Sequence, residues 1–107
     1  MPFLGGILTT NVYFRVFKTE KDIMVAVCDA DILGKKFSDG KRKLEIKESF
    51  YKGILGTLED GIKAMNDATI VNVLGEKIIT KMIDDGLISE HSVICICGIP
   101  HVQIICI

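Results

Sequence analysis

The chain has 107 residues, of which 49% are hydrophobic, and a formal net charge of -1 at pH 7. This length suits one core, so we expect a single domain over residues 1–107, in which residues 1–10 form an N-terminal extension. A net charge near zero argues against binding to nucleic acid or to an acidic membrane through the overall charge of the protein. The charge is nevertheless uneven, because residues 1–52 hold ten Lys and Arg against seven Asp and Glu, and the remainder holds three against seven.

The N-terminal segment, Met1–Leu8, is apolar but lacks the basic lead and the cleavage site of a signal peptide. No segment reaches the roughly 18 apolar residues of a membrane span. We therefore expect a cytoplasmic protein that does not contact a membrane. The apolar segments 3–8 and 104–107 suggest pairing between chains, so a homo-oligomer is a further option.

The first predicted elements are two strands. Residues 11–18 alternate between two faces, and residues 23–28 form a continuous apolar run; the short connection between them predicts an antiparallel hairpin. Residues 29–34 then predict one helical turn, which Asp29 caps and Gly34 ends. One face of the first strand carries Tyr13, Arg15 and Phe17.

The middle of the chain predicts a turn at residues 38–41 and a third strand at residues 43–47, with Leu44 and Ile46 inward. Residues 48–56 are irregular and predict a loop, which Phe50 and Tyr51 anchor to the core.

Two helices are predicted in the second half. The first begins at Thr57, where Asp60 completes a weak capping box, and the second covers residues 76–85 and ends at Gly86. Between them, residues 69–74 predict a strand.

The last predicted strands, residues 93–97 and 102–107, flank a tight turn at residues 98–101. Their apolar runs predict burial on both faces in the middle of a sheet. The spacing from Leu74 to Val93 is that of a β-α-β crossover between parallel strands. The fold class is therefore α/β (or α+β): a single-domain mixed sheet with an N-terminal antiparallel hairpin, one crossover, a C-terminal apolar strand pair and two main helices.

The four cysteines contain no C-x-x-C pair. A zinc site would need Cys28, Cys106 or His101 to converge on Cys95 and Cys97. We predict reduced core thiols, with no metal and no cofactor.

Polar residues follow the predicted strand ends. Ligands gather at the carboxyl ends of parallel strands, so these residues predict a candidate site at one edge of the sheet. Lys35 and Lys36 lie nearby in the sequence. The site consists of Asp29, Asp31, Asn72, Glu76 and His101.

Each candidate catalytic residue also has a structural interpretation. His101 suits a general base or a structural hydrogen bond. Asp29 and Asp31 suit a carboxylate pair, although Asp29 suits a helix cap equally well. Asn72, in an apolar strand, either fastens a neighbouring loop or faces a ligand.

The second functional feature is a basic stretch that carries a charge of +4 over thirteen residues. Lys and Arg near aromatic side chains contact phosphates and stack on bases, as in proteins that bind single-stranded RNA. The alternative is a strand edge that lysines protect against aggregation. The candidate RNA-binding residues are Lys35, Lys36, Lys41, Arg42 and Lys43, with Lys47 close by.

Five ordered motifs resemble a known family. They are V-A-V-C-D-A-D-I-L-G-K from Val25, F-Y-x-G from Phe50, A-x-x-x-N-x-x-G from Ala68, D-G-L-I from Asp85 and G-I-P-H-V-Q from Gly98. Together they are similar to the archaeal proteins grouped as domain of unknown function 424. The resemblance implies an archaeal cytoplasmic protein and gives no activity for this chain. A role linked to translation is expected by association alone, since such families often have one.

Two functional hypotheses follow. The first is a small module that binds RNA or a ribonucleoprotein, with ribosomal or translation components as partners. The alternative is a small-molecule-binding protein or enzyme with a site around His101, Asn72 and Asp31. Whether the protein is an enzyme stays open.

Overall fold

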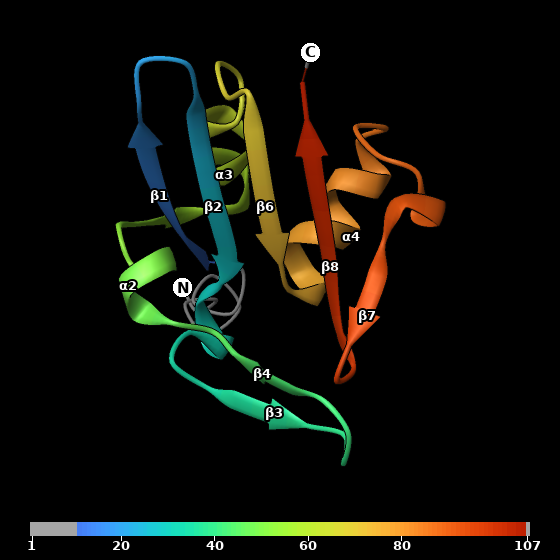
Figure 1. The fold of residues 1–107 in the computed structure, drawn as a ribbon. Helices are drawn as coiled ribbons and strands as arrows, with labels where there is room; N and C mark the ends of the chain where they lie inside the picture. The colour runs from blue at the N-terminus through green and yellow to red at the C-terminus, as the bar shows by residue number, and fades with distance from the viewer. Residues whose placement is uncertain (1–10, 107) are drawn as a thin grey trace, which may run out of the picture.

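A computed structural model describes residues 11–106, which form a mixed α+β structure. The main sheet has six strands in the order β5-β1-β2-β6-β8-β7, and a second sheet pairs β3 with β4 (Figure 1). The strands are β1 (Asn11–Lys18), β2 (Ile23–Asp29), β3 (Lys36–Ser38), β4 (Lys43–Glu45), β5 (Ile54–Thr57), β6 (Ile70–Leu74), β7 (Ile94–Ile96) and β8 (Ile99–Ile105). The helices are α2 (Glu48–Tyr51), α3 (Leu58–Ala64) and α4 (Glu76–Asp84), with 3-10 turns η1 (Ala30–Ile32) and η2 (Glu90–Ser92).

The pairing of the strands confirms the predicted hairpin, because β1 and β2 are antiparallel neighbours. The parallel neighbour of β6 is β2, and α3 lies in the connection between them. The predicted crossover through α4 joins β6 to β7, which run in the same direction. These two strands are not adjacent, however, because β8 lies between them and pairs with both in antiparallel fashion.

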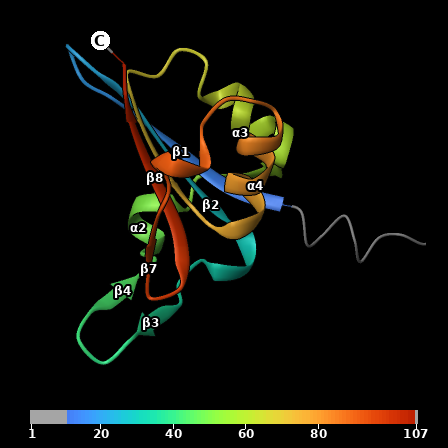
Figure 2. The same cartoon turned by 90° about the vertical axis from the view of Figure 1, so that its right-hand side faces the viewer.

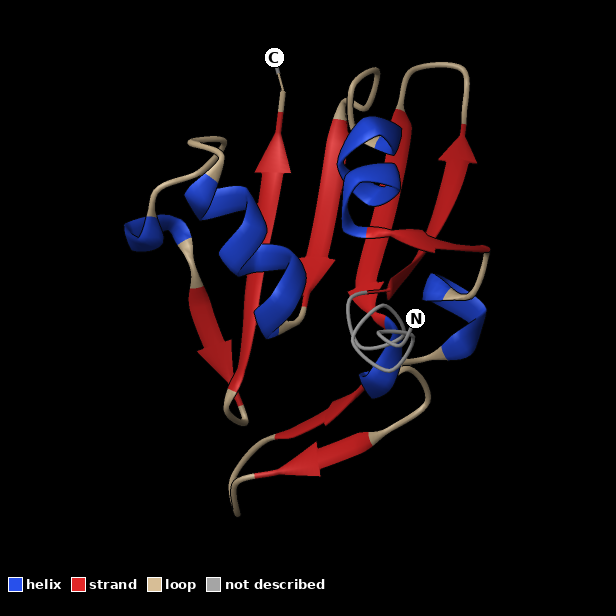
Figure 3. Ribbon diagram, turned by 180° about the vertical axis from the view of Figure 1, so that it is seen from behind, coloured by secondary structure: helices blue, strands red, loops and turns tan. Residues whose placement is uncertain are grey.

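The two faces of the main sheet are covered differently. Helices α3 and α4 pack across one face (Figure 3). There the buried side chains of α4 and the valines of β1, β2 and β6 form the larger core cluster. On the other side lie α2 and the β3–β4 hairpin (Figure 2), which bury a smaller cluster at one end of the sheet. That cluster consists of Ala26, Cys28, Ile46, Tyr51 and Leu74.

Local sequence signals explain the ends of both longer helices. Thr57 and Asp60 exchange hydrogen bonds as a full capping box at the start of α3, as predicted. At the end of α4, Gly86 has a φ of 75°, and its N–H donates to the carbonyl of Ile83 while the N–H of Leu87 donates to that of Met82. This is a Schellman motif, and it confirms Gly86 as the stop signal.

The C-terminal prediction was partly wrong. The strand β8 lies inside the sheet, but β7 is a short edge strand in which Ile94 and Cys95 are exposed. The turn has only two residues, Cys97 and Gly98, with φ values of 52° and 81°, so residues 99–101 belong to β8. A two-residue turn with two positive φ values matches the twist of the paired strands of a hairpin. The sequence did not predict this turn, because a cysteine does not indicate a positive φ.

Two further elements were missed. The segment 48–56, predicted as a loop, contains α2 and the edge strand β5, although Tyr51 and Phe50 do anchor it to the core as expected. The predicted third strand, 43–47, is shortened to β4, because it pairs with the three residues of β3 rather than with the main sheet.

Among residues 11–106, no helix combines the length and the apolar character needed to cross a membrane. The predicted N-terminal extension, residues 1–10, and Ile107 lie outside the described residues.

Candidate functional site

The basic stretch of the sequence forms the β3–β4 hairpin and its flanks, and its lysines are exposed and unpaired. The side chains of Lys35, Lys36, Lys41 and Lys43 are exposed to solvent. The ion pairs found between residues 11 and 106 involve none of them. Glu45 lies directly across from Lys36 on the hairpin but forms no ion pair with it, so the four lysines outnumber the one acidic side chain of the paired strands and present a surface of positive charge.

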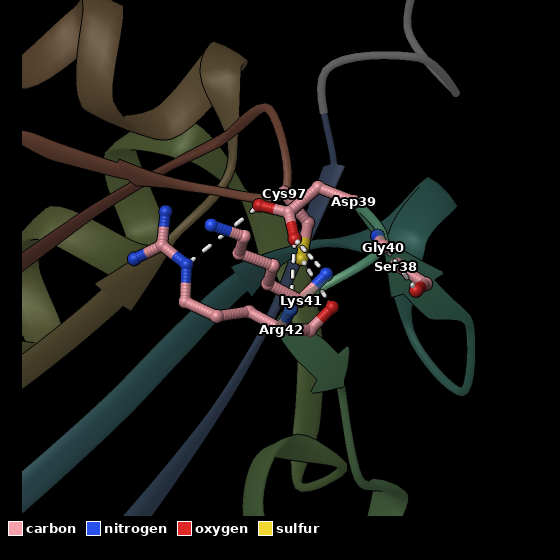
Figure 4. Close-up of polar contacts among 6 residues, drawn as sticks. All are labelled: Ser38, Asp39, Gly40, Lys41, Arg42 and Cys97. Atoms are coloured by element: carbon pink, nitrogen blue, oxygen red, sulfur yellow. Dashed lines mark hydrogen bonds and ion pairs between the residues drawn. The ribbon is translucent and has the colours of Figure 1, made fainter.

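The tip of the hairpin is ordered by one carboxylate (Figure 4). The Asp39 carboxylate accepts hydrogen bonds from the backbone N–H groups of Lys41 at 3.2 Å and Arg42 at 2.8 Å, and it lies 3.6 Å from the Arg42 guanidinium. These N–H groups, with that of Arg42 first, lower the pKa of Asp39. Asp39 therefore holds the turn and neutralises Arg42, while the lysines around it stay free.

The hairpin is fixed to the main sheet through its inner face. Phe37 and Leu44 are cross-strand partners that belong to the smaller cluster together with Ile99 of β8. The Cys97 thiol also donates to the carbonyl of Arg42 at 3.5 Å. A hollow of about 440 Å³ along the hairpin is lined by residues of both strands, among them Lys36, Lys43 and Glu45. The outer lysines are thus held on a positioned ribbon.

Asp29 is a helix cap, as one of the two interpretations expected, but it caps α4 and not the adjacent turn η1. Its side chain is 2% exposed and does not cap the adjacent turn η1. Its two oxygens accept the N–H groups of Lys77 at 2.8 Å and Ile78 at 3.0 Å, so it caps α4 from the end of β2. Burial raises the pKa of Asp29, and these two N–H groups act against that rise.

The predicted edge does bring several strand ends together. A hollow of about 190 Å³ is lined by residues that follow β2, β6 and β7, among them Asp31, Gly75 and Pro100. Inside this region the Lys77 ammonium lies 2.6 Å from the Asp31 carboxylate. The cap from Asp29 and the Asp31–Lys77 pair engage three of the four charged side chains that line this hollow. The fourth, Glu76, lies in the first turn of α4, is exposed and takes part in none of the ion pairs found among residues 11–106.

The other two catalytic candidates lie elsewhere. Asn72 is opposite Gln103 in the middle of the sheet, and its amide donates to the Met24 sulfur at 3.7 Å. His101, on β8, pairs with Leu74 of β6 and does not line the hollow at the edge. Its Nδ1 is buried and has no hydrogen-bond partner among residues 11–106, and burial lowers the pKa of His101. The four candidates therefore do not share one hollow.

The cysteines differ from the prediction of core thiols. Of the four free cysteines, only Cys28 is buried, where burial raises its pKa to about 12; Cys95 and Cys106 are exposed. At neutral pH the Cys28 thiol therefore stays protonated and is a poor nucleophile. Within residues 11–106, no cluster of three or more His, Cys, Asp and Glu side chains is placed to hold a metal ion.

Sequence reasoning missed an ordered aromatic and cationic stack on the sheet. The Arg15 guanidinium lies 4.7 Å from the centre of the Phe17 ring and donates to the carbonyl of Ser49. On α2, the Phe50 ring stacks with Phe17 at 5.5 Å. The alternation of the first strand placed Arg15 and Phe17 on one face, but no local signal showed that α2, rather than the longer helices, would pack there.

One family model matches most of the chain. The family model described as "Protein of unknown function (DUF424)" matches residues 17–107. A solved structure of an uncharacterized conserved protein from Methanopyrus kandleri is similar, with 29% identity and a TM-score of 0.71, over 88% of this chain and 90% of that one. A comparison with curated proteins finds no match. Neither description names an activity.

Proposed function

We propose that this chain, which belongs to the family of proteins of unknown function DUF424, is a small RNA- or ribonucleoprotein-binding module whose working surface is the β3–β4 hairpin. The observation that carries the proposal is the ribbon of exposed lysines that form no ion pair with any carboxylate among residues 11–106. Lysines held on a fixed scaffold neutralise backbone phosphates and release their counterions, which is the main source of affinity for RNA. The proposed role includes a cytoplasmic location, where thiols stay reduced.

The charge of the molecule is divided between its two sides, which supports the proposal. Acidic residues of the second half of the sequence lie on α3, α4, η2 and the connections near them: Glu59, Asp60, Asp67, Glu76, Asp84, Asp85 and Glu90. The hairpin lies on the opposite side of the sheet (Figure 2). A polyanion would therefore approach the hairpin side and be repelled by the helical side.

The test is an affinity measurement over a range of salt concentrations. Fluorescence anisotropy with a labelled single-stranded RNA should give an affinity that falls steeply with salt. In the Lys36→Ala/Lys43→Ala double variant, the slope of log K against log salt should become less steep by about 1.4, because each phosphate contact on a single strand contributes about 0.7.

The matched control removes the same charge from other places. Lys21, in the turn after β1, and Lys63, on α3, are exposed and lie outside the hairpin. The Lys21→Ala/Lys63→Ala variant should keep the wild-type slope. Equal losses in both double variants would mean that only net charge matters, and the hairpin would not be the binding surface. Absence of salt-sensitive RNA binding in the wild type would refute the function itself.

A further inference from the structure

Figure 1 shows the main sheet from the face opposite α3 and α4. On this face the side chains form rows across the strands. The strand registers place one side chain from each of β1, β2, β6 and β8 in each row. The row nearest the β1–β2 turn is Phe17, Met24, Ile70 and Ile105, and the next is Arg15, Ala26, Asn72 and Gln103. Neither row contains an acidic side chain.

The next row towards the hairpin is Tyr13, Cys28, Leu74 and His101, and it is covered: Cys28 and Leu74 are buried in the smaller cluster. Ala26, in the row of Arg15, is buried in the same cluster. Around it the face opens towards the β1–β2 turn, where Arg15, Gln103 and Ile105 are exposed, the last at 65% of its surface. The sheet therefore presents a partly apolar surface that the covered row separates from the hairpin (Figure 1).

Arg15 gives this surface a fixed planar cation. Its guanidinium lies over the Phe17 ring, and the hydrogen bond to the Ser49 carbonyl fixes its position. Phe50 stacks on Phe17. Arg15 as a whole is exposed to solvent, so a ligand can reach it. Nucleic-acid bases stack on such guanidinium planes.

Two amides complete the row. Asn72 and Gln103 are direct partners across β6 and β8, and Gln103 is exposed. In the part of the chain that the structure describes, the Asn72 amide donates only to the Met24 sulfur, a weak acceptor. Paired amide groups offer donors and acceptors to the edges of unpaired bases.

We infer that this face holds unpaired bases of a single-stranded RNA whose backbone lies along the basic hairpin. The inference rests on the proposed function. It commits to RNA because the face joins a planar cation and base-like hydrogen-bonding amides without any carboxylate, and because the unpaired lysines lie on the same side of the sheet (Figure 2). Duplex RNA hides its bases in the helix, so the inference predicts a preference for single strands.

The test uses three single variants of the full chain and an RNA of about 12 nucleotides, in single-stranded and duplex forms. Arg15→Lys keeps the charge and removes the plane, and Gln103→Ala removes an exposed amide. Each should weaken single-strand binding about five-fold or more, with an unchanged salt slope. Thr80→Ala, exposed on α4, is the control and should bind like the wild type. Circular dichroism verifies that each variant is folded.

The outcomes separate this inference from the proposed function. If the wild type binds RNA with a steep salt dependence but Arg15→Lys and Gln103→Ala bind equally well, the hairpin acts alone and the inference is overturned. Equal affinity for the duplex would overturn it too. If the variants change only self-association in sedimentation, the face is an interface between copies of the chain. Loss of all RNA binding in the wild type would refute the proposed function.

Discussion

At the residue scale, the carboxylate of Asp29 joins β2 to α4, and it leaves no space at the residue before the helix. A Cβ added at Gly75 would lie 2.4 Å from the Asp29 Cγ, and Gly75 has a φ of 127°. Only glycine combines this backbone conformation with so close an approach.

Replacing this glycine should therefore be costly. Gly75→Ala should lower the free energy of unfolding by about 3 kcal/mol or more, because strain and a close contact add. Gly86→Ala is the control: its φ is also positive, but no atom lies within 4 Å of the added Cβ, so the loss should be about 1 kcal/mol. Urea unfolding measures both. Equal losses would contradict the close approach of Asp29.

His101 provides a prediction about pH. Burial lowers its pKa from the usual 6.5, so the imidazole should be neutral at pH 7 and titrate below 6.5 in NMR spectra of the ring protons. A depressed folded-state pKa contributes stability above the unfolded pKa, and that contribution is lost as the pH falls through the folded value. A midpoint at or above 6.5 would contradict the burial of Nδ1.

The sequence predicted that Asp29 is a cap but not which helix it caps. Local spacing suggested η1, whereas the N–H groups that it accepts come from residues 77 and 78. Such a partner is decided by tertiary packing, because a buried carboxylate needs two donors and α4 supplies them. The sequence named Asn72 and His101 as candidates but could not predict their surroundings, because these depend on which side of the sheet receives the helices.

At the element scale, the β7–β8 turn holds a cysteine at a positive φ of 52°. Cys97→Asn should raise the free energy of unfolding by up to about 1 kcal/mol, because asparagine tolerates this conformation. Cys97→Val should lower it, since β-branched side chains tolerate it poorly. Thermal unfolding compares the two, and a more stable valine variant would contradict the turn geometry.

The elements that the sequence predicted well are those with strong local signals. The alternation of residues 11–18, the capping box at Thr57 and the glycine stop after α4 all appear as expected. The weak elements β3 and β5 have three and four residues and depend on pairing with distant strands. Short apolar runs did not reveal that β7 lies at an edge, because exposure there follows from strand order alone.

At the scale of the whole molecule, two core clusters lie on opposite faces of the same central strands. Val25 and Val27 belong to one, and Ala26 and Cys28 belong to the other. Loss of β2 would therefore expose both. We predict one cooperative unfolding transition, with coincident midpoints for far-ultraviolet circular dichroism and tyrosine fluorescence. Two separate transitions would contradict the single domain expected from the sequence.

The distribution of charge is the other property of the whole molecule, and it favours RNA binding on one side of the sheet. The hairpin and the open rows lie on one side of the sheet, and the acidic helices lie on the other. A net charge of -1 conceals this division, which becomes visible only when the layers are known. The sequence predicted the basic residues, and the fold determines where they lie.

The most direct measurement is ultraviolet crosslinking of the protein to RNA in native cell extract, followed by mass spectrometry of the crosslinked peptides. We predict crosslinks within residues 35–47 and on the open rows around Arg15 and Gln103, which disappear at high salt. An absence of crosslinked RNA, or crosslinks confined to α3 and α4, would contradict the proposed function.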